Sequence, residues 1–382
     1  MSNLALYLKL KDLLQGIYAG HNRSIDGWIV KTLAMMITGM LLGPHVQLFA
    51  IAMCIPITAK LPSLTRRLER FVADERIEVG TLFESFVIAM IACLGNETAY
   101  LVIDCTQAGP KCRTLFIGLC YHHTVLPLVW KTHRGSKGHL KGQQHCELLE
   151  QLYPQFRFHR RVIVLGDAEF SNEPVMTWLH AHHWNFVLRF QSNYLIQTAP
   201  DSLWQSAQAL YQAAHLTPGQ VQHWEQVSFT EAHQTAGLTM TVQWGEREKE
   251  PVCLISDLPA CEQPHLLYDR RYWVETLFGN CKSRGFQLAR TEMEQPEHID
   301  RLVLAITIAT CLTLGLGTHL IVTQQADQVD RADRRDLSLF QLGWRWLYRL
   351  LALNRLNELR MVLRWDFQLP SPGFQPALQR AA

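Results

Sequence analysis

No two cysteines in this 382-residue sequence are spaced as CxxC, although ten cysteines are scattered along the chain. The missing pairs exclude the common zinc-binding spacings, and several of the cysteines stand in apolar runs, where buried and reduced thiols are usual. The N-terminus lacks a basic stretch followed by an apolar run and a small-residue cleavage site, so we do not expect secretion. Together these absences predict a cytoplasmic protein without disulfide bonds.

A strong net charge is also lacking, because 36 Lys and Arg residues against 34 Asp and Glu residues leave a formal charge of +2. The whole chain is therefore not a strongly basic nucleic-acid binder, and any DNA-binding surface must come from local clusters of positive charge. Two clusters are candidates for such a surface. The alternative for each is an ordinary basic surface that faces solvent. The clusters are residues 130–145 with Lys131, Arg134, Lys137 and Lys141, and an expected helix over residues 61–71 with Arg66, Arg67 and Arg70.

Formal charge is missing from two long stretches, residues 32–59 and 302–326, and each is long enough to cross a bilayer. Glycine and proline break the first stretch into what we expect to be two short buried helices. The second stretch contains Gly315, Gly317 and His319 and has no aromatic residues at its ends. We therefore predict the buried core helix of a sizeable domain, with a membrane span as the alternative.

Between residues 98 and 190 the apolar pattern changes from a helical to a strand-like period. We expect three antiparallel strands, a helix, a strand, a second helix capped by Asn172, and a fifth strand, in that order. Strands that are apolar throughout are typical of the buried centre of a sheet covered by helices. The expected strands are residues 98–107, 113–121, 124–131, 162–165 and 185–190, and the expected helices are residues 141–152 and 176–182.

Two of these strands lead into an aspartate. Asp104 stands at the carboxyl end of the first expected strand, in IDCTQ, and Asp167 follows the fourth, in LGDAEF. Taken alone, either residue is ordinarily a capping or turn aspartate, which is common where strands end. A function for them therefore depends on a third group elsewhere in the chain.

The most informative stretch is residues 265–285, HLLYDRRYWVETLFGNCKSRG, in which no proline or glycine stands before Gly279. Its apolar side predicts a helix, and at about 100° per residue four polar positions fall within roughly 60° of one another. That face presents one carboxylate between two cations and a phenol, groups that suit a divalent metal and phosphates. The alternative is a solvated face on which Arg271 and Glu275, one helical turn apart, form a salt bridge. The four positions are Tyr268, Arg271, Glu275 and Lys282.

These four residues resemble the Tyr-Arg-Glu-Lys signature of bacterial insertion-sequence transposases of the DDE class, which are cut-and-paste enzymes with a ribonuclease-H-like core. The separations of 63 residues from Asp104 to Asp167 and of 108 from Asp167 to Glu275 are also similar to those of the family. The resemblance implies an α/β fold with a ribonuclease-H-like mixed sheet flanked by helices. It further implies a β-rich insertion before the catalytic helix and an all-helical N-terminal domain.

The resemblance also implies a role for each matching residue. Asp104, Asp167 and Glu275 are expected to bind two Mg²⁺ ions, which Mn²⁺ can replace, and to catalyse DNA cleavage at the element's ends and strand transfer into target DNA. Glu169, two positions after Asp167, is expected to be a supporting residue or an exposed one rather than a ligand. The residues expected to contact DNA are Tyr268, Arg271 and Lys282.

Composition and the resemblance divide the chain into five segments. Three tryptophans of the insertion, Trp204, Trp224 and Trp244, are candidates for stacking an extruded base, and ordinary packing is the alternative for each. In the last segment, residues 337–363 are expected to form a pair of helices. The segments are a helical DNA-binding domain (1–95), the first part of the catalytic core (96–190), the β-rich insertion (191–265), the second part of the core (266–325), and a helical region with a disordered tail (326–382).

The expected partners are double-stranded DNA, both as terminal inverted repeats and as target, and a second copy of the chain in a synaptic complex. No membrane is expected, and the protein should lie in the cytoplasm, on the nucleoid when it acts. Two other classes stay open. A stand-alone ribonuclease-H-like nuclease would keep the three carboxylates without needing the flanking cations. A non-catalytic DNA-binding derivative would normally have lost a carboxylate, and none is missing here.

Overall fold

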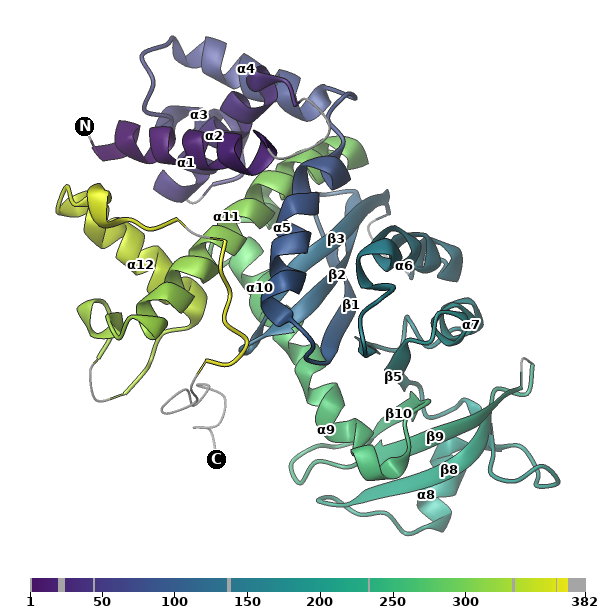
Figure 1. Cartoon of the computed structure of the whole chain (residues 1–382). Helices are drawn as coiled ribbons and strands as arrows, with labels where there is room; N and C mark the ends of the chain where they lie inside the picture. The colour runs from purple at the N-terminus through teal and green to yellow at the C-terminus, as the bar shows by residue number, and fades with distance from the viewer. Residues whose placement is uncertain are drawn as a thin grey trace.

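The computed structural model describes residues 2–19, 25–43, 45–135, 139–232, 234–331, 334–361 and 363–369. One large mixed sheet runs through the molecule, with helices on both faces and a helical N-terminal region at one end (Figure 1). The predicted α/β fold class is confirmed. Lys137 of the basic segment and the expected disordered tail from residue 370 lie outside the described residues.

Five helices form the N-terminal region, as the periodicity of its apolar residues predicts. The uncharged stretch that begins at residue 32 divides into two helices, α2 and α3. Asp26 begins α2 by accepting the backbone N–H of Trp28 at 2.8 Å, which satisfies one of the free amides of the first turn. The helices are α1 (Ser2–Ala19), α2 (Gly27–Leu42), α3 (Leu48–Cys54), α4 (Leu61–Ala73) and α5 (Val79–Leu94).

The core strands follow the predicted order, and their pairing gives the topology of a ribonuclease-H-like domain. β1, β2 and β3 form an antiparallel meander, β1 pairs in parallel with β4, and β4 pairs in parallel with β5. β4 is buried at every position, as expected for a central strand between two layers of helices. The strands are β1 (Ala99–Gln107), β2 (Cys112–Tyr121), β3 (Thr124–Arg134), β4 (Val162–Gly166) and β5 (Asn185–Phe190).

Helices cover both faces of this sheet (Figure 1). α6 and α7 lie on one face, and α5, α10 and α11 lie on the other. Asn172 caps α7 as predicted, because its Oδ1 accepts the N–H of Val175 at 3.2 Å. The helices not yet given are α6 (Gly142–Phe156), α7 (Glu173–Ala181), α10 (Trp273–Cys281) and α11 (Pro296–Val322).

α11 is, in the described part of the chain, the one helix long and apolar enough to cross a membrane. Its whole apolar window is buried inside the protein, which confirms the predicted core helix. Two buried charged residues in it are both partnered. Asp300 accepts the N–H of Thr132 at 2.8 Å, and Arg301 donates to backbone carbonyls at the end of α4 and just before α5. These bonds tie α11 to the sheet and to the N-terminal region.

The insertion extends the core sheet instead of forming a sheet of its own. β10 pairs antiparallel with β5, and the complete sheet has ten strands in the order β3-β2-β1-β4-β5-β10-β9-β8-β6-β7. The predicted β-rich character is confirmed, and one short helix, α8 (Ala207–Ala213), is an element that the alternating pattern does not predict. The strands are β6 (Leu195–Gln197), β7 (Gln205–Ser206), β8 (Val221–Phe229), β9 (Thr235–Gln243) and β10 (Val252–Ser256).

The C-terminal region contains one helix where the sequence predicts a pair. α12 (Leu339–Ala352) is followed by Asn354, which takes a left-handed conformation with φ of 53°. A residue in that conformation ends a helix, and in residues 355–361 and 363–369, which the structure describes, only a single 3₁₀ turn, Leu356–Glu358, follows. The prediction of a helical pair over residues 337–363 is therefore wrong for its second half.

α12 crosses α11 so closely that two glycines are required. A Cβ on Gly317 would lie 2.0 Å from the carbonyl oxygen of Leu339, and a Cβ on Gly343 would lie 1.9 Å from that of Thr313. Gly16 in α1 is the opposite case, because no atom lies within 4 Å of its Cβ position. Close packing thus requires glycine at the helix crossing, whereas in α1 glycine only lowers the stability of the helix.

Gly343→Ala is expected to lower the free energy of unfolding by about 2 kcal/mol or more, because the two helices must separate. Gly16→Ala is the matched control and is expected to raise it by up to about 1 kcal/mol, because alanine favours a helix. Urea unfolding followed by circular dichroism measures both changes. Small effects of equal sign would contradict the close crossing of α11 and α12.

Candidate active site

The pairing of β1 with β4 sets the positions of the two aspartates. The strands run parallel, and their last paired residues are Ile103 and Gly166. Asp104 and Asp167 each follow directly after one of these two residues, so they lie side by side on neighbouring strands about 4.8 Å apart. β1 continues to Gln107, so Asp104 lies within its strand rather than at the carboxyl end, where the sequence analysis placed it.

A backbone amide orients each aspartate. Oδ1 of Asp104 accepts the N–H of Cys105 at 2.7 Å, and Oδ1 of Asp167 accepts the N–H of Glu169 at 3.0 Å. The second contact is an Asx turn, in which a side chain bonds the main chain two residues on. Each carboxylate thus has one oxygen held by the main chain, and its other oxygen, Oδ2, is left for a partner.

The stretch predicted as one helix consists of three successive helical pieces. A 3₁₀ segment lies in its middle, and this geometry turns about 120° per residue instead of 100°. Lys282 follows the end of α10 and does not continue it. The predicted single helix therefore does not carry all four signature residues, because Lys282 lies beyond its end, whereas Arg271 and Glu275 face each other one turn apart. The pieces are α9 (Pro264–Tyr268), the 3₁₀ segment (Asp269–Tyr272) and α10 (Trp273–Cys281).

The guanidinium of Arg271 lies among the three predicted carboxylates. Its Nη2 is 3.0 Å from Oδ2 of Asp104 and 3.3 Å from Oδ2 of Asp167, and its Nη1 is 3.7 Å from Oε1 of Glu275. Both aspartate oxygens approach the same nitrogen, so they are at most about 6 Å apart, the sum of the two distances. The structure therefore brings the three predicted residues into one cluster, and a residue predicted to contact DNA stands at its centre.

Burial determines the electrostatics of this cluster. Asp104 is buried, and desolvation raises its pKa to about 6 even though Arg271 opposes the shift. Burial alone would lower the pKa of Arg271, but the surrounding carboxylates, Asp104 first, raise it above its usual value, so the guanidinium stays charged. One cation facing three carboxylates leaves negative charge in excess, and this excess suits the cluster to take further positive charge.

The other two residues predicted to contact DNA lie differently. Tyr268 is only 3% exposed, burial raises the pKa of its phenol, and the ring of Tyr272 packs edge-on against it. Lys282 is half-buried, and burial lowers the pKa of its ammonium group, an effect that Cys281 and Asp104 oppose. Tyr268 is thus part of the packed interior, and Lys282 stands near the cluster. Their contacts with DNA stay predictions.

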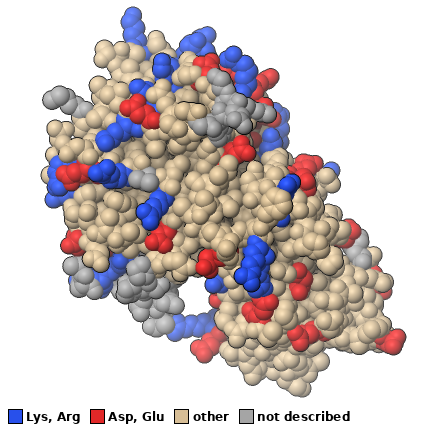
Figure 2. Space-filling model, in the orientation of Figure 1, with Lys and Arg blue, Asp and Glu red and all other residues tan. Residues whose placement is uncertain are grey.

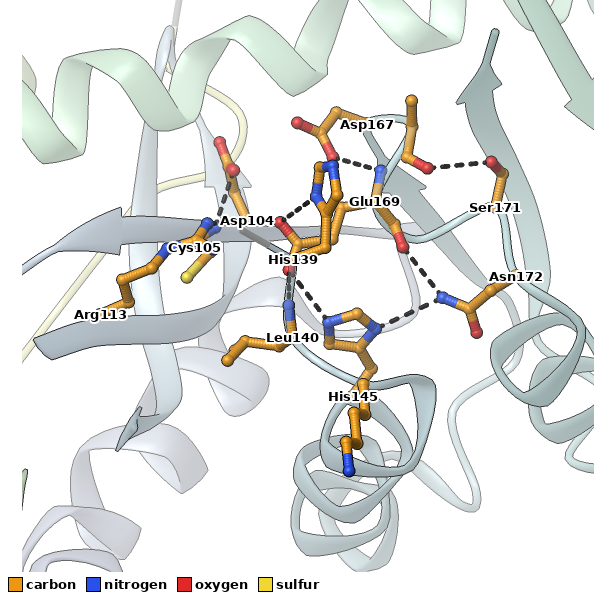
Figure 3. A network of polar contacts seen from close by, with 12 residues as sticks. Asp104, Cys105, Arg113, His139, Leu140, His145, Asp167, Glu169, Ser171 and Asn172 are labelled. Atoms are coloured by element: carbon orange, nitrogen blue, oxygen red, sulfur yellow. Dashed lines mark hydrogen bonds and ion pairs between the residues drawn. The ribbon is translucent and has the colours of Figure 1, made fainter. Parts of the chain in front are cut away.

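Beside the end of β4, Glu169 is the hub of a polar network (Figure 3). Its Oε1 accepts the N–H of Leu140 at 2.7 Å and lies 3.4 Å from Nε2 of buried His145. Its Oε2 lies 3.3 Å from Nη2 of Arg113 and 3.2 Å from Nδ1 of His139. Burial alone would raise the pKa of Glu169, but these contacts lower it to about 2, so the carboxylate is ionised. Its side chain is 5% exposed, which excludes the expected alternative of an exposed residue.

Glu169 can be singled out in the sequence by its position near Asp167, whereas its partners Arg113, His139 and His145 cannot. These residues are 24 to 56 positions away from it along the chain. They meet only because β2, the basic segment and α6 pack around the end of β4. A local signal for them does not exist in the sequence, although an acidic residue two positions after a strand-end aspartate marks the place to look.

The donor set of the cluster fits a hard divalent cation, because three carboxylates offer only oxygen ligands. Among the residues that the structure describes, no three His, Cys, Asp or Glu side chains already stand in a metal-binding arrangement. The guanidinium of Arg271 contacts all three carboxylates instead. A cation can enter only if Arg271 gives up part of these contacts. Asp104, Asp167 and Glu275 would then hold it.

Positive charge is unevenly spread over the surface. In the view of Figure 2, Lys and Arg gather over the N-terminal helices and α12, whereas acidic side chains are more frequent over the insertion. Arg66 and Arg70 of α4 are exposed, and Arg67 donates a hydrogen bond to Thr32 at 2.9 Å. This distribution favours the N-terminal helices over the insertion as a surface for a phosphate backbone.

One of the three tryptophans lines a cavity at the edge of the sheet where the two aspartates lie. β4 and β5 end at the edge where β10 begins and β9 ends, and Trp244 directly follows β9. A cavity of about 520 Å³ lies there, lined by Trp244, Tyr211 and Lys249 among others. Trp204 lies between β6 and β7, and Trp224 lies within β8. Trp244 is therefore the best placed of the three for a ligand near the carboxylates.

Three comparisons with known proteins were made. A sequence model of the family described as "Transposase DDE domain" matches residues 110–312, just over half of the chain. The match includes Asp167 and Glu275 and begins six residues after Asp104. The chain is similar to the solved structure of a piggyBac transposase synaptic complex with hairpin DNA, at 13% sequence identity and a TM-score of 0.42, over 97% of this chain and 84% of that one. A comparison with curated proteins found no match.

Arg271→Ala is expected to lower the melting temperature in EDTA, because three carboxylates then face one another without their cation. The loss corresponds to about 2 kcal/mol of unfolding free energy. Millimolar Mg²⁺ should raise the melting temperature of the variant by more than that of the wild type, since the metal no longer competes with the guanidinium.

Differential scanning fluorimetry with and without Mg²⁺ makes this comparison. Arg270→Ala is the matched control, because the guanidinium of Arg270 packs over the ring of Tyr100, 4.5 Å from its centroid, and not in the cluster. Equal Mg²⁺ shifts in Arg271→Ala and in the wild type would contradict the competition.

Proposed function

The chain belongs to the transposase DDE-domain family, and from this premise we propose that it is an insertion-sequence transposase that cleaves DNA at the ends of its element and transfers them into target DNA. The observation that carries the proposal is the meeting of Asp104, Asp167 and Glu275 around one guanidinium in a ribonuclease-H-like core. The first two come from adjacent parallel strands, and the third comes from the helical segment packed across them. The Tyr-Arg-Glu-Lys residues support placing the chain with bacterial insertion-sequence enzymes.

The cofactor we propose is Mg²⁺, as two ions held by the three carboxylates, with Mn²⁺ as a substitute. When bound, such ions supply Lewis-acid activation of the attacking oxygen and stabilise the departing 3′ oxygen during in-line displacement at phosphorus. The protein's part is to hold the donor oxygens in place. Backbone amides fix Oδ1 of each aspartate, so that Oδ2 keeps its direction while Arg271 moves.

The reaction we propose has two displacements. In the first, water attacks the phosphodiester at the element's end, the bond from phosphorus to the 3′ oxygen breaks, and a 3′ hydroxyl is released. In the second, that hydroxyl attacks a phosphodiester of the opposite strand or of the target, and a new phosphodiester forms as another 3′ oxygen leaves. Arg271, once released from the carboxylates, and Lys282 provide positive charge for the phosphates beside the reacting bond.

The other parts of the chain serve recognition in this proposal. The helices of residues 1–95 bind the terminal inverted repeats, and exposed Arg66 and Arg70 favour such a contact. Two copies of the chain join the two ends in a synaptic complex. The protein acts in the cytoplasm, on the nucleoid.

Supercoiled-plasmid cleavage tests the proposal, with a plasmid that carries both ends of the chain's own element. Breaks at those ends are expected with Mg²⁺ and not with EDTA, and Glu275→Gln should abolish them because a neutral amide attracts a hard cation far less than a carboxylate does. Glu292→Gln, at an exposed position outside the cluster, is the control and should cleave like the wild type. Cleavage throughout the plasmid would indicate a general nuclease. End binding without cleavage would indicate a repurposed DNA-binding protein.

For the three tryptophans, we propose that Trp244 receives an extruded base in the cavity that it lines with Tyr211. Its position supports this role, because β9 is three strands from β4, roughly 14 Å at the usual strand spacing. A short unpaired stretch of nucleotides at the reacting end is long enough to reach from the carboxylates to Trp244. Lys249, which also lines the cavity, adds a cation for its phosphate.

Trp244→Ala is expected to weaken binding of a cleaved end about tenfold or more, from the loss of one base–aromatic stack. A 2-aminopurine placed in turn at each terminal position should be quenched by the wild type at one position and not by the variant. Trp204→Ala is the matched control, in the same insertion but away from the cavity, and should keep the quenching. The proposal would be refuted if Trp244→Ala kept it as well.

A further inference from the structure

The Glu169 network joins parts of the chain that the proposed reaction leaves without a role. Arg113 reaches Glu169 from β2, and His145 reaches it from the first turn of α6. His139 and the N–H of Leu140 come from the end of the basic segment, residues 130–145, immediately before α6. A carboxylate has about four lone-pair positions, and these four contacts take up both of its oxygens. Glu169 is therefore not free to be a metal ligand itself.

The network acts on Asp167 through the main chain. The N–H that holds Oδ1 of Asp167 at 3.0 Å belongs to Glu169, the residue whose side chain is anchored. Asn172 adds a second anchor, because its Nδ2 donates to the carbonyl oxygen of Glu169 at 2.9 Å while its Oδ1 caps α7. The peptide group that orients Asp167 joins Ala168 to Glu169, and its own carbonyl oxygen, that of Ala168, accepts the hydroxyl of Ser171 at 3.2 Å. With this carbonyl, the next one and the Glu169 side chain all held, that peptide group has little freedom to rotate.

We propose that Glu169 is a positioning residue that couples the basic segment to Asp167. This inference rests on the proposed function, because it takes Asp167 as a metal ligand. One side chain fixes the backbone of the segment at Leu140, and the main chain of the same residue fixes the carboxylate of Asp167. A phosphate backbone that binds beside Leu140 is thereby placed at a set distance from the metal site. The backbone at Leu140 and the carboxylate of Asp167 are held by the same residue.

Two measurements on the full chain test the coupling, and neither depends on catalysis. Isothermal titration with Mn²⁺ measures the metal affinity, and hydrogen exchange measures the protection of the Leu140 amide. Glu169→Ala should weaken Mn²⁺ binding about tenfold, the low end of the range for supporting residues of metal ligands, and should speed exchange at Leu140. Glu169→Gln keeps an oxygen acceptor for that amide, so it should lose less of the Mn²⁺ affinity and less of the protection at Leu140. Glu147→Ala, at an exposed position of α6, should change neither.

Asp167→Asn separates a failure of this inference from a failure of the proposed function. If that variant binds Mn²⁺ like the wild type, the metal site itself is wrong. If it abolishes binding while Glu169→Ala binds Mn²⁺ normally, with or without faster exchange at Leu140, the coupling is overturned and the metal site stands. If Glu169→Ala abolishes binding as completely as Asp167→Asn, Glu169 is a ligand and the positioning role is overturned. Should Glu169→Ala not fold, a Glu169→Gln protein with unchanged affinity and exchange would overturn the coupling.

Discussion

The arrangement of the candidate active site depends on the ion pairs that one guanidinium makes with three carboxylates. Asp104 and Asp167 come side by side because β1 and β4 share a parallel register, and Glu275 joins them because the helical segment packs across those strands. Carboxylates brought together and desolvated in this way are costly without a counter-charge. Arg271 supplies that charge in the structure, and in the proposed reaction a divalent cation would supply it. The cluster therefore always needs a cation, and the competition between its two sources connects stability with function.

The rest of the fold keeps this cluster in place. α11 is buried along its apolar length and is fastened to the sheet and to the N-terminal helices through Asp300 and Arg301, so the layer that carries α10 has a rigid support. On the other face, Glu169 connects the end of β4 with α6 and with the basic segment. The insertion continues the same sheet, which places the cavity beside Trp244 at the edge where the aspartates lie. Core, insertion and basic segment thus share one scaffold.

The sequence was informative where the chemistry is local. Each aspartate is attached to an apolar strand, and Glu275 stands in a helical stretch with cations at helical spacing, so the three carboxylates and the order of the strands could be predicted. Apolar periodicity cannot separate a 3₁₀ segment from an α-helix over four residues, and the break before α10 was missed. The position of Arg271 among the carboxylates depends on how the segment sits over the sheet, and the partners of Glu169 lie far from it in the chain. The five segment boundaries and the DNA contacts of Tyr268 and Lys282 stay predictions.

The central claim is that the three carboxylates form a metal site from which Arg271 withdraws. Crystals grown with Mn²⁺ and measured at the manganese absorption edge test it most directly, because anomalous scattering locates the ions independently of the protein atoms. The account predicts manganese peaks within ligand distance of Asp104, Asp167 and Glu275, with the guanidinium of Arg271 turned away from at least one aspartate. Manganese bound elsewhere, or none at millimolar concentration while Arg271 keeps all three carboxylates, would contradict it.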